Sequence, residues 1–103
     1  MAEKIIDQAI SSQKISMLSA STDWYCPHLK DEIAKAGCSE YLTVLEVDCQ
    51  VDCTKAELLN YCARLTGGRA LPKFWVKGRY FGGGAEMETA LRNGSMNRIL
   101  GRF

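Results

Sequence analysis

The chain has 103 residues, 47% of them hydrophobic, and its 13 basic and 12 acidic side chains leave a net charge of +1. This length and composition predict one ordinary globular domain, residues 1–103, with a core that needs no covalent staple. Because the charges are scattered and nearly balanced, and no apolar run is long enough to cross a membrane, we expect neither nucleic acid nor a membrane as a partner.

The cysteine content indicates a reducing compartment. Five cysteines are an odd number and lack the density of a secreted disulfide scaffold. Residues 1–7 contain no long apolar stretch of the kind found in a secretory signal. We therefore expect a cytoplasmic monomer whose thiols are free or redox-active.

The first half of the chain predicts helices and strands in alternation. Apolar residues that recur at a helical period indicate an amphipathic helix of about three turns near the N-terminus. The expected elements are this helix, a strand at 14–20, a helix at 30–36 ended by Gly37, and a strand at 41–47. A strand, a helix and a strand joined at these lengths predict parallel pairing through a right-handed crossover.

The second half begins with a capping box and continues with a hairpin. Thr54 is the expected N-cap of a helix, with Glu57 reaching back to it. After a glycine pair, two short strands surround a Lys-Gly turn, which is typical of a hairpin. The expected elements are a helix from Thr54 to Gly67, strands at 73–76 and 79–81, a helix with Met87, Ala90 and Leu91 stopped by Asn93 and Gly94, and a short helix capped by Ser95.

A cysteine lies at the expected turn between the first strand and the second helix. It stands in the run Trp24-Tyr25-Cys26-Pro27-His28-Leu29. Unpaired N–H groups and the positive end of the dipole at a helix N-terminus favour a thiolate, and proline suits the first helical turn. This is the setting of a C-x-x-C redox turn, but Leu29 stands where the second cysteine would be. An internal disulfide at this turn is therefore excluded.

The order of the expected elements is that of an α/β, thioredoxin-like fold, with a central four-stranded mixed sheet flanked by helices. Four segments with matching spacing make the chain resemble the glutaredoxins over nearly its whole length. They are the segments at residues 24–27, 47–48, 65–72 and 82–86, which read Trp-Tyr-Cys-Pro, Val-Asp, Leu-Thr-Gly-Gly-Arg-Ala-Leu-Pro and Gly-Gly-Gly-Ala-Glu.

The resemblance implies roles for individual residues. Cys26 matches the nucleophile that attacks a glutathione mixed disulfide, and Pro72 matches a cis-proline beside its sulfur. The backbone of Leu71 matches a partner of the cysteinyl part of glutathione, and Arg69 could meet its glycyl carboxylate. At a helix N-terminus, Gly84 and Ala85 match the N–H groups that hold the γ-glutamyl carboxylate. The implied glutathione-binding residues are Tyr25, His28, Arg69, Leu71, Pro72, Gly83, Gly84 and Ala85.

Several positions depart from the family pattern. Members with two active-site cysteines read C-P-Y-C, whereas this chain reads C-P-H-L, and the C-G-F-S signature of cluster-carrying members is absent. Asp23 stands in place of a lysine and repels both a thiolate and a ligand carboxylate. Leu59 replaces a glutamine that contacts glutathione, and Ala85 replaces an aspartate that meets its amine.

The other candidate residues have less specific interpretations. His28 is expected to be an exposed substitute for the family's tyrosine, although a protonated imidazole could stabilise a thiolate. Cys26 and His28 have too few neighbouring ligands for zinc, so we expect no metal site. Cys49 and Cys53 could form a bridge, but free thiols are favoured. Cys38 and Cys62 are expected to be packing residues.

Two functions follow from the resemblance. The first is a glutathione-dependent thiol transferase that uses only Cys26 and acts on glutathionylated protein or small-molecule disulfides. The second is a catalytically weakened binding or regulatory module of the same fold, which could still hold glutathione or an iron–sulfur cluster. The departures at Asp23, Leu59 and Ala85 support the second function, and Cys26, Pro72 and the glycine run support the first.

Overall fold

The computed structural model of the chain describes residues 1–101, so the last two residues of the expected domain lie outside it. The elements are α1 (Ala2–Ser12), β1 (Ile15–Ser19), α2 (Tyr25–Lys35), a 3-10 helix (Ser39–Tyr41), β2 (Leu42–Glu46), α3 (Lys55–Thr66), β3 (Lys73–Val76), β4 (Arg79–Gly83), α4 (Gly84–Arg92) and α5 (Ser95–Ile99). No helix within residues 1–101 is long and apolar enough to span a membrane.

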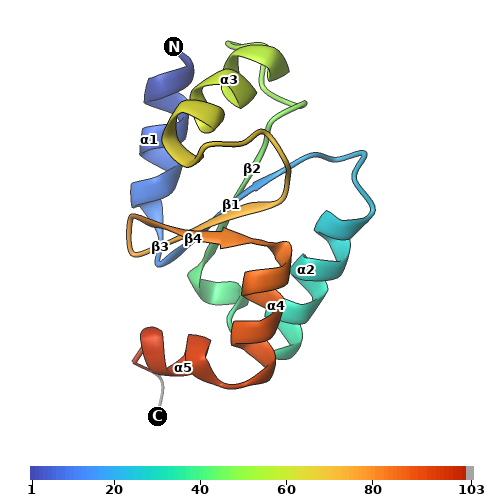
Figure 1. The fold of residues 1–103 in the computed structure, drawn as a ribbon, viewed down its shortest axis with the longest axis vertical. Helices are drawn as coiled ribbons and strands as arrows, with labels where there is room; N and C mark the ends of the chain where they lie inside the picture. The colour runs from blue at the N-terminus through green and yellow to red at the C-terminus, as the bar shows by residue number, and fades with distance from the viewer. Residues whose placement is uncertain (102–103) are drawn as a thin grey trace.

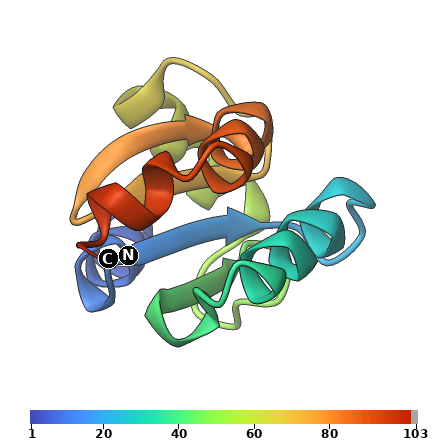
Figure 2. The same ribbon diagram turned by 90° about the horizontal axis from the view of Figure 1, so that it is seen from below.

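The four strands form one mixed sheet in the order β2-β1-β3-β4. β1 pairs in parallel with β2, as predicted, and antiparallel with β3, which forms the hairpin with β4. Helices α1 and α3 cover one face of the sheet, and α2, α4 and α5 lie on the other (Figures 1 and 2). This is the predicted thioredoxin-like architecture.

Alternation along β1 divides the core into two clusters, one on each face of the sheet. Met17 belongs to the cluster beneath α2 and α4, and the neighbouring Leu18 belongs to the cluster beneath α1 and α3. Ser16 is also buried, and its hydroxyl donates to the carbonyl of Ala9 in α1 at 2.7 Å. The first strand is therefore buried on both sides, which explains why apolar residues occur at neighbouring as well as at alternate positions along it.

The main correction concerns the start of α2. The sequence predicted a helix at 30–36, but the structure begins it at Tyr25, so the cysteine turn is helical. The strand predicted at 14–20 is Ile15–Ser19, the one at 41–47 is Leu42–Glu46, and the one at 79–81 extends to Gly83. Differences of one or two residues at strand ends are expected, because element boundaries are the part of a structure that a sequence pattern specifies least sharply.

The short C-terminal helix begins differently from the prediction. Ser95 is its first residue and not its cap, because Gly94 in a left-handed conformation holds the cap position. The side chain of Asn93 accepts hydrogen bonds from both the backbone N–H and the hydroxyl of Ser95. The prediction that Asn93 and Gly94 stop α4 is confirmed, since α4 ends at Arg92.

The capping box of α3 supplies a test of the fold. The N–H of Glu57 donates to the Thr54 hydroxyl at 3.1 Å, and the N–H of Thr54 donates to the Glu57 carboxylate at 3.1 Å. We expect Thr54→Ala to lower the free energy of unfolding by about 1 kcal/mol, because the N–H of Glu57 loses the hydroxyl that accepts its hydrogen bond.

Urea denaturation followed by circular dichroism measures this change. Thr89→Ala is the matched control, because Thr89 is exposed within α4, where alanine has the higher helix propensity. Equal losses for the two substitutions would contradict a capping role.

Candidate functional site

The cysteine of the redox turn is the second residue of α2, and its side chain faces the core. Cys26 is 0% exposed and packs in the cluster that contains Leu29, Phe74 and Met87. The predicted position at a helix N-terminus is therefore observed, but the exposure that a reactive cysteine needs is not present in this conformation. Attack on an external disulfide requires the residues around the thiol to move.

Asp23 has a structural role that the sequence did not indicate. Its carboxylate accepts a hydrogen bond from the N–H of Tyr25 at 2.9 Å. This satisfies one of the N–H groups left unpaired at the start of α2, while the cap residue Trp24 makes no side-chain bond to the helix. The aspartate that stands in place of the family's lysine thus stabilises the first turn.

A second carboxylate fixes the preceding loop. Asp48, which follows β2, accepts hydrogen bonds from the N–H of Ser21 at 2.9 Å and from the Ser21 hydroxyl. These bonds hold the pKa of Asp48 below its usual value. They tie the loop between β1 and α2 to the residues that follow β2.

Tyr25 joins α2 to the N-terminus of α4. A Cβ atom on Gly84 would lie 2.3 Å from Cε2 of the Tyr25 ring, so the ring packs directly on the glycine backbone. The Tyr25 hydroxyl donates to Glu88 at 3.2 Å. Burial, followed by this hydrogen bond, raises the pKa of Tyr25. The sequence analysis assigned the N–H of Gly84 to a ligand carboxylate, and the structure adds that the missing side chain gives room to an aromatic ring.

The rest of the glycine run is shaped by Glu86. Gly82 has a φ of +151°, and a Cβ there would lie 2.8 Å from Cβ of Glu86. The N–H of Gly83 donates to the Glu86 carboxylate at 2.7 Å. A negative charge therefore already lies at the N-terminus of α4, where Gly84 and the exposed Ala85 were predicted to hold a ligand carboxylate.

The segment before β3 has the predicted backbone. The peptide bond between Leu71 and Pro72 is cis, Pro72 is buried and Leu71 is half-buried. These residues follow the loop that carries Arg69, whose guanidinium donates to the side chain of Asn60 in α3.

A surface groove of about 460 Å³ lies beside the redox loop, between the N-terminus of α3 and the loop that follows α3. It is lined by Ala20, Thr22, Asp23, Trp24, Lys55, Leu59, Arg69 and Leu71. The groove thus brings together four residues that the sequence analysis linked to glutathione or to its loss. Cys26, His28, Pro72 and residues 83–85 do not line it.

Lys55 is a functional candidate that the sequence analysis missed. It shares the groove with Arg69, and these two cations outnumber the single carboxylate of Asp23. A basic residue at the first position of a helix is unfavourable for the helix dipole, which was the available signal. Lys55 adds to the positive charge of the groove.

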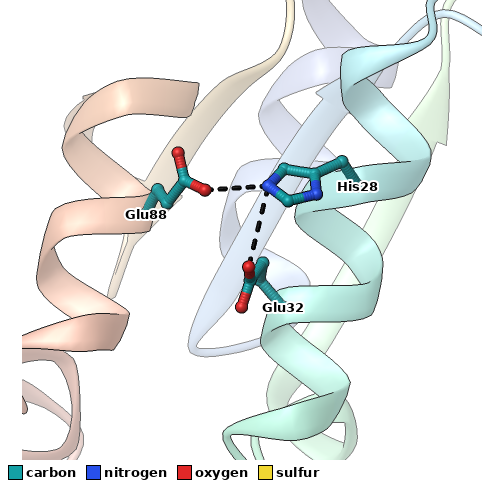
Figure 3. A group of neighbouring side chains, drawn as sticks. All are labelled: His28, Glu32 and Glu88. Atoms are coloured by element: carbon teal, nitrogen blue, oxygen red, sulfur yellow. Dashed lines mark hydrogen bonds and ion pairs between the residues drawn. The ribbon is translucent and has the colours of Figure 1, made fainter.

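His28 takes part in a cluster that links α2 to α4 (Figure 3). Its Nε2 lies 2.8 Å from Glu88 and 3.7 Å from Glu32, and Arg92 forms ion pairs with both carboxylates. The hydrogen bond with His28, aided by Tyr25 and Arg92, holds the pKa of Glu88 below its usual value. The sequence predicted an exposed His28, but its side chain is only 40% exposed.

The five cysteines are arranged mostly as predicted. Cys38 and Cys62 are fully buried packing residues, and burial raises the pKa of Cys62. Within residues 1–101, Cys49 and Cys53 are free thiols, with Cys49 exposed and Cys53 buried.

The contact between Tyr25 and Gly84 generates a prediction. We expect Gly84→Ala to lower the free energy of unfolding by about 1–3 kcal/mol, because the added methyl group overlaps the ring and separates α2 from α4. Urea denaturation measures the loss, and near-ultraviolet circular dichroism reports the displaced aromatic ring.

Gly68→Ala is the matched control for that substitution. A Cβ at Gly68 meets only the end of the Lys73 side chain, at 3.8 Å, and should be tolerated. If Gly84→Ala is as stable as Gly68→Ala, the packing of the Tyr25 ring on α4 does not depend on a glycine at position 84.

Comparison with solved structures places this geometry among known folds. The chain superimposes on oxidized glutaredoxin 2 from Chlamydomonas reinhardtii with a TM-score of 0.82 and 26% identity, covering 99% of this chain and 95% of the other. The holo form of glutaredoxin C1 from Populus tremula x tremuloides gives 0.84 at 23% identity, covering 97% and 95%. A buckwheat glutaredoxin–glutathione complex gives 0.85 at 22% identity, covering 98% and 88%. No protein-family model and no curated protein matched the sequence. The chain has the thioredoxin-like fold of the glutaredoxins over nearly its whole length.

Proposed function

We propose that the chain is a glutathione-dependent thiol transferase that works through Cys26 alone. The observation that carries the proposal is the position of this cysteine in the first turn of α2, next to a cationic groove. The glutaredoxin fold supports it. The residue three positions after Cys26 is the buried Leu29 and not a cysteine, so the turn offers no second thiol.

The groove suits the glycyl end of glutathione. Lys55 and Arg69 can attract its carboxylate, and the backbone of Leu71 can pair with its cysteinyl part as an added strand. The γ-glutamyl carboxylate would meet the N–H groups of Gly84 and Ala85, but Glu86 already caps this helix. We therefore expect weak binding that depends mainly on the groove.

The reaction has two displacement steps. The Cys26 thiolate attacks the glutathionyl sulfur of a mixed disulfide, and the substrate leaves as a thiolate that takes up a proton. The thiolate of a second glutathione then attacks the glutathionylated Cys26, which releases the enzyme thiolate and glutathione disulfide. Two glutathionyl sulfurs are joined and the substrate disulfide is reduced, so no further reductant is needed. Because Cys26 is buried, a local opening precedes the first step.

A binding module without catalysis is the second candidate function. The specific observation in its favour is the complete burial of Cys26 beneath the first turn of α2. Glutathione could still occupy the groove in such a module. An iron–sulfur cluster does not fit this conformation, since its thiolate ligand would have to leave the core.

Catalysis by Cys26 separates the two candidates. We expect Cys26→Ser to reduce the release of glutathione from a glutathionylated peptide to the uncatalysed background, because serine cannot form the mixed disulfide. Cys49→Ser, which changes an exposed thiol outside the groove, should keep the parent rate. A parent protein that is no faster than Cys26→Ser would leave only the binding module.

The cationic groove gives a prediction that does not depend on turnover. Lys55→Ala and Arg69→Ala should each weaken glutathione binding severalfold, because a charge-assisted hydrogen bond at an exposed site is worth about 1 kcal/mol. Leu59→Gln should tighten binding by adding a donor to the same groove.

Chemical-shift titration by NMR measures these affinities and locates the bound ligand. Lys4→Ala in α1 is the control, since it removes one exposed positive charge away from the groove. Equal affinities for the Lys4, Lys55 and Arg69 variants would show that glutathione does not use the groove.

A further inference from the structure

We propose that His28, Glu32 and Glu88 form a zinc-binding site on the surface between α2 and α4. His28 and Glu32 lie one helical turn apart on α2, and both side chains point toward Glu88 on α4 (Figure 3). One ligand atom from each residue lies within 4.8 Å of the other two.

The separations suit a small ion. Nε2 of His28 lies 2.8 Å from Oε2 of Glu88 and 3.7 Å from Oε1 of Glu32. Ligand atoms around a tetrahedral zinc ion with bonds of about 2.0–2.2 Å are about 3.4 Å apart. Small rotations of the side chains therefore bring all three atoms to zinc, and a water molecule can complete the tetrahedron.

Contacts from outside the three ligands hold them in this orientation. The Tyr25 hydroxyl donates to Oε1 of Glu88, which leaves Oε2 directed at His28. The Tyr25 ring also stacks on the His28 imidazole, with centroids 5.8 Å apart and planes at 13°. Such supporting contacts orient ligands at metal sites and reduce the entropy lost on binding.

The charge balance favours a divalent cation. Two carboxylates meet at this point, and the guanidinium of Arg92 lies 3.3 Å from Glu32 and 2.8 Å from Glu88. The Arg92 side chain is 65% exposed, so it can move into solvent at small cost when a metal ion replaces it. Glu32 and Glu88 remain 20% exposed, which gives an ion access to the site.

The donor set selects the metal. One imidazole nitrogen with two carboxylate oxygens suits zinc, whereas magnesium and calcium prefer sites made only of oxygen. The sequence analysis expected no metal because it considered His28 together with Cys26, which the structure directs into the core. The ligands that complete the set come from one turn further along α2 and from α4.

His28 is the only histidine of the chain, so its imidazole resonances report on this site alone. The experiment titrates the full chain carrying Cys49→Ser with zinc chloride, because this substitution removes the exposed thiol that could compete for the metal. We expect the His28 resonances to shift and saturate at one zinc ion per chain. Magnesium chloride at the same concentrations should leave them unchanged.

Matched variants test the carboxylate ligands and the displaced arginine. Glu32→Gln and Glu88→Gln should each weaken zinc binding at least tenfold, while Arg92→Ala should strengthen it by removing a competing cation. Glu40→Gln changes an exposed acid outside the cluster and should have no effect.

Three outcomes would overturn the proposal. If zinc leaves the His28 resonances of the Cys49→Ser chain unchanged, or if magnesium shifts them equally, the cluster is only an ion-pair network between two helices. The same conclusion follows if the two glutamine variants, with native circular dichroism, bind zinc as tightly as Glu40→Gln does. The zinc titration of the Cys49→Ser chain decides whether the site exists, even where a further variant fails to fold.

Discussion

The contact of the Tyr25 ring with the backbone of Gly84 determines how the two halves of the candidate site are arranged. The ring can approach α4 only because residue 84 has no side chain, and its hydroxyl then reaches Glu88 one turn further along. Since Tyr25 is the first residue of α2, this contact sets the position of the whole first turn. It directs Cys26 toward the sheet and His28 toward α4.

This arrangement places opposite charges on either side of the tyrosine. The groove beside the redox loop carries Lys55 and Arg69, whereas the cluster between α2 and α4 carries Glu32 and Glu88. The proposed site for a ligand carboxylate therefore lies on the side with Lys55 and Arg69, and the proposed metal site on the side with the two glutamates. The thiol lies beneath the first turn of α2, and neither surface can reach it without movement of that turn.

Local signals in the sequence were sufficient for most of the fold. The capping box at Thr54 and Glu57 joins residues only three positions apart, and the crossover between β1 and β2 follows from the order of the elements. The predicted range 30–36 left out the first residues of α2, because the carboxylate that stabilises its first turn, Asp23, lies outside the helix. The hydrogen bond from the N–H of Tyr25 to Asp23 depends on the local backbone geometry, which the periodicity of hydrophobic residues does not reveal.

The candidate site was less predictable because its contacts join distant segments. Glu88 lies 60 residues from His28 and 63 from Tyr25, and no periodic pattern links such positions. Resemblance to a family correctly indicated the cis bond before Pro72, which is a property of the backbone. It could not indicate that Tyr25 fills the space at Gly84 or that Glu86 caps α4, because both depend on the side chains of this particular chain.

The two proposals are connected through Glu88. Transfer would need the Cys26 thiol to become exposed, whereas zinc binding would hold the first turn of α2 over it. Exposure of Cys26 requires the first turn of α2 to move, which breaks the hydrogen bond between the Tyr25 hydroxyl and Oε1 of Glu88. A zinc ion on Oε2 of the same carboxylate would fix Glu88 in its present place and connect it directly to His28 on α2. A bound metal would then add to the free energy of the proposed opening, because its three ligands lie together in the closed arrangement. If both proposals hold, the bonds of Tyr25 and His28 to one glutamate would couple the reactivity of the buried thiol to the occupancy of the surface site.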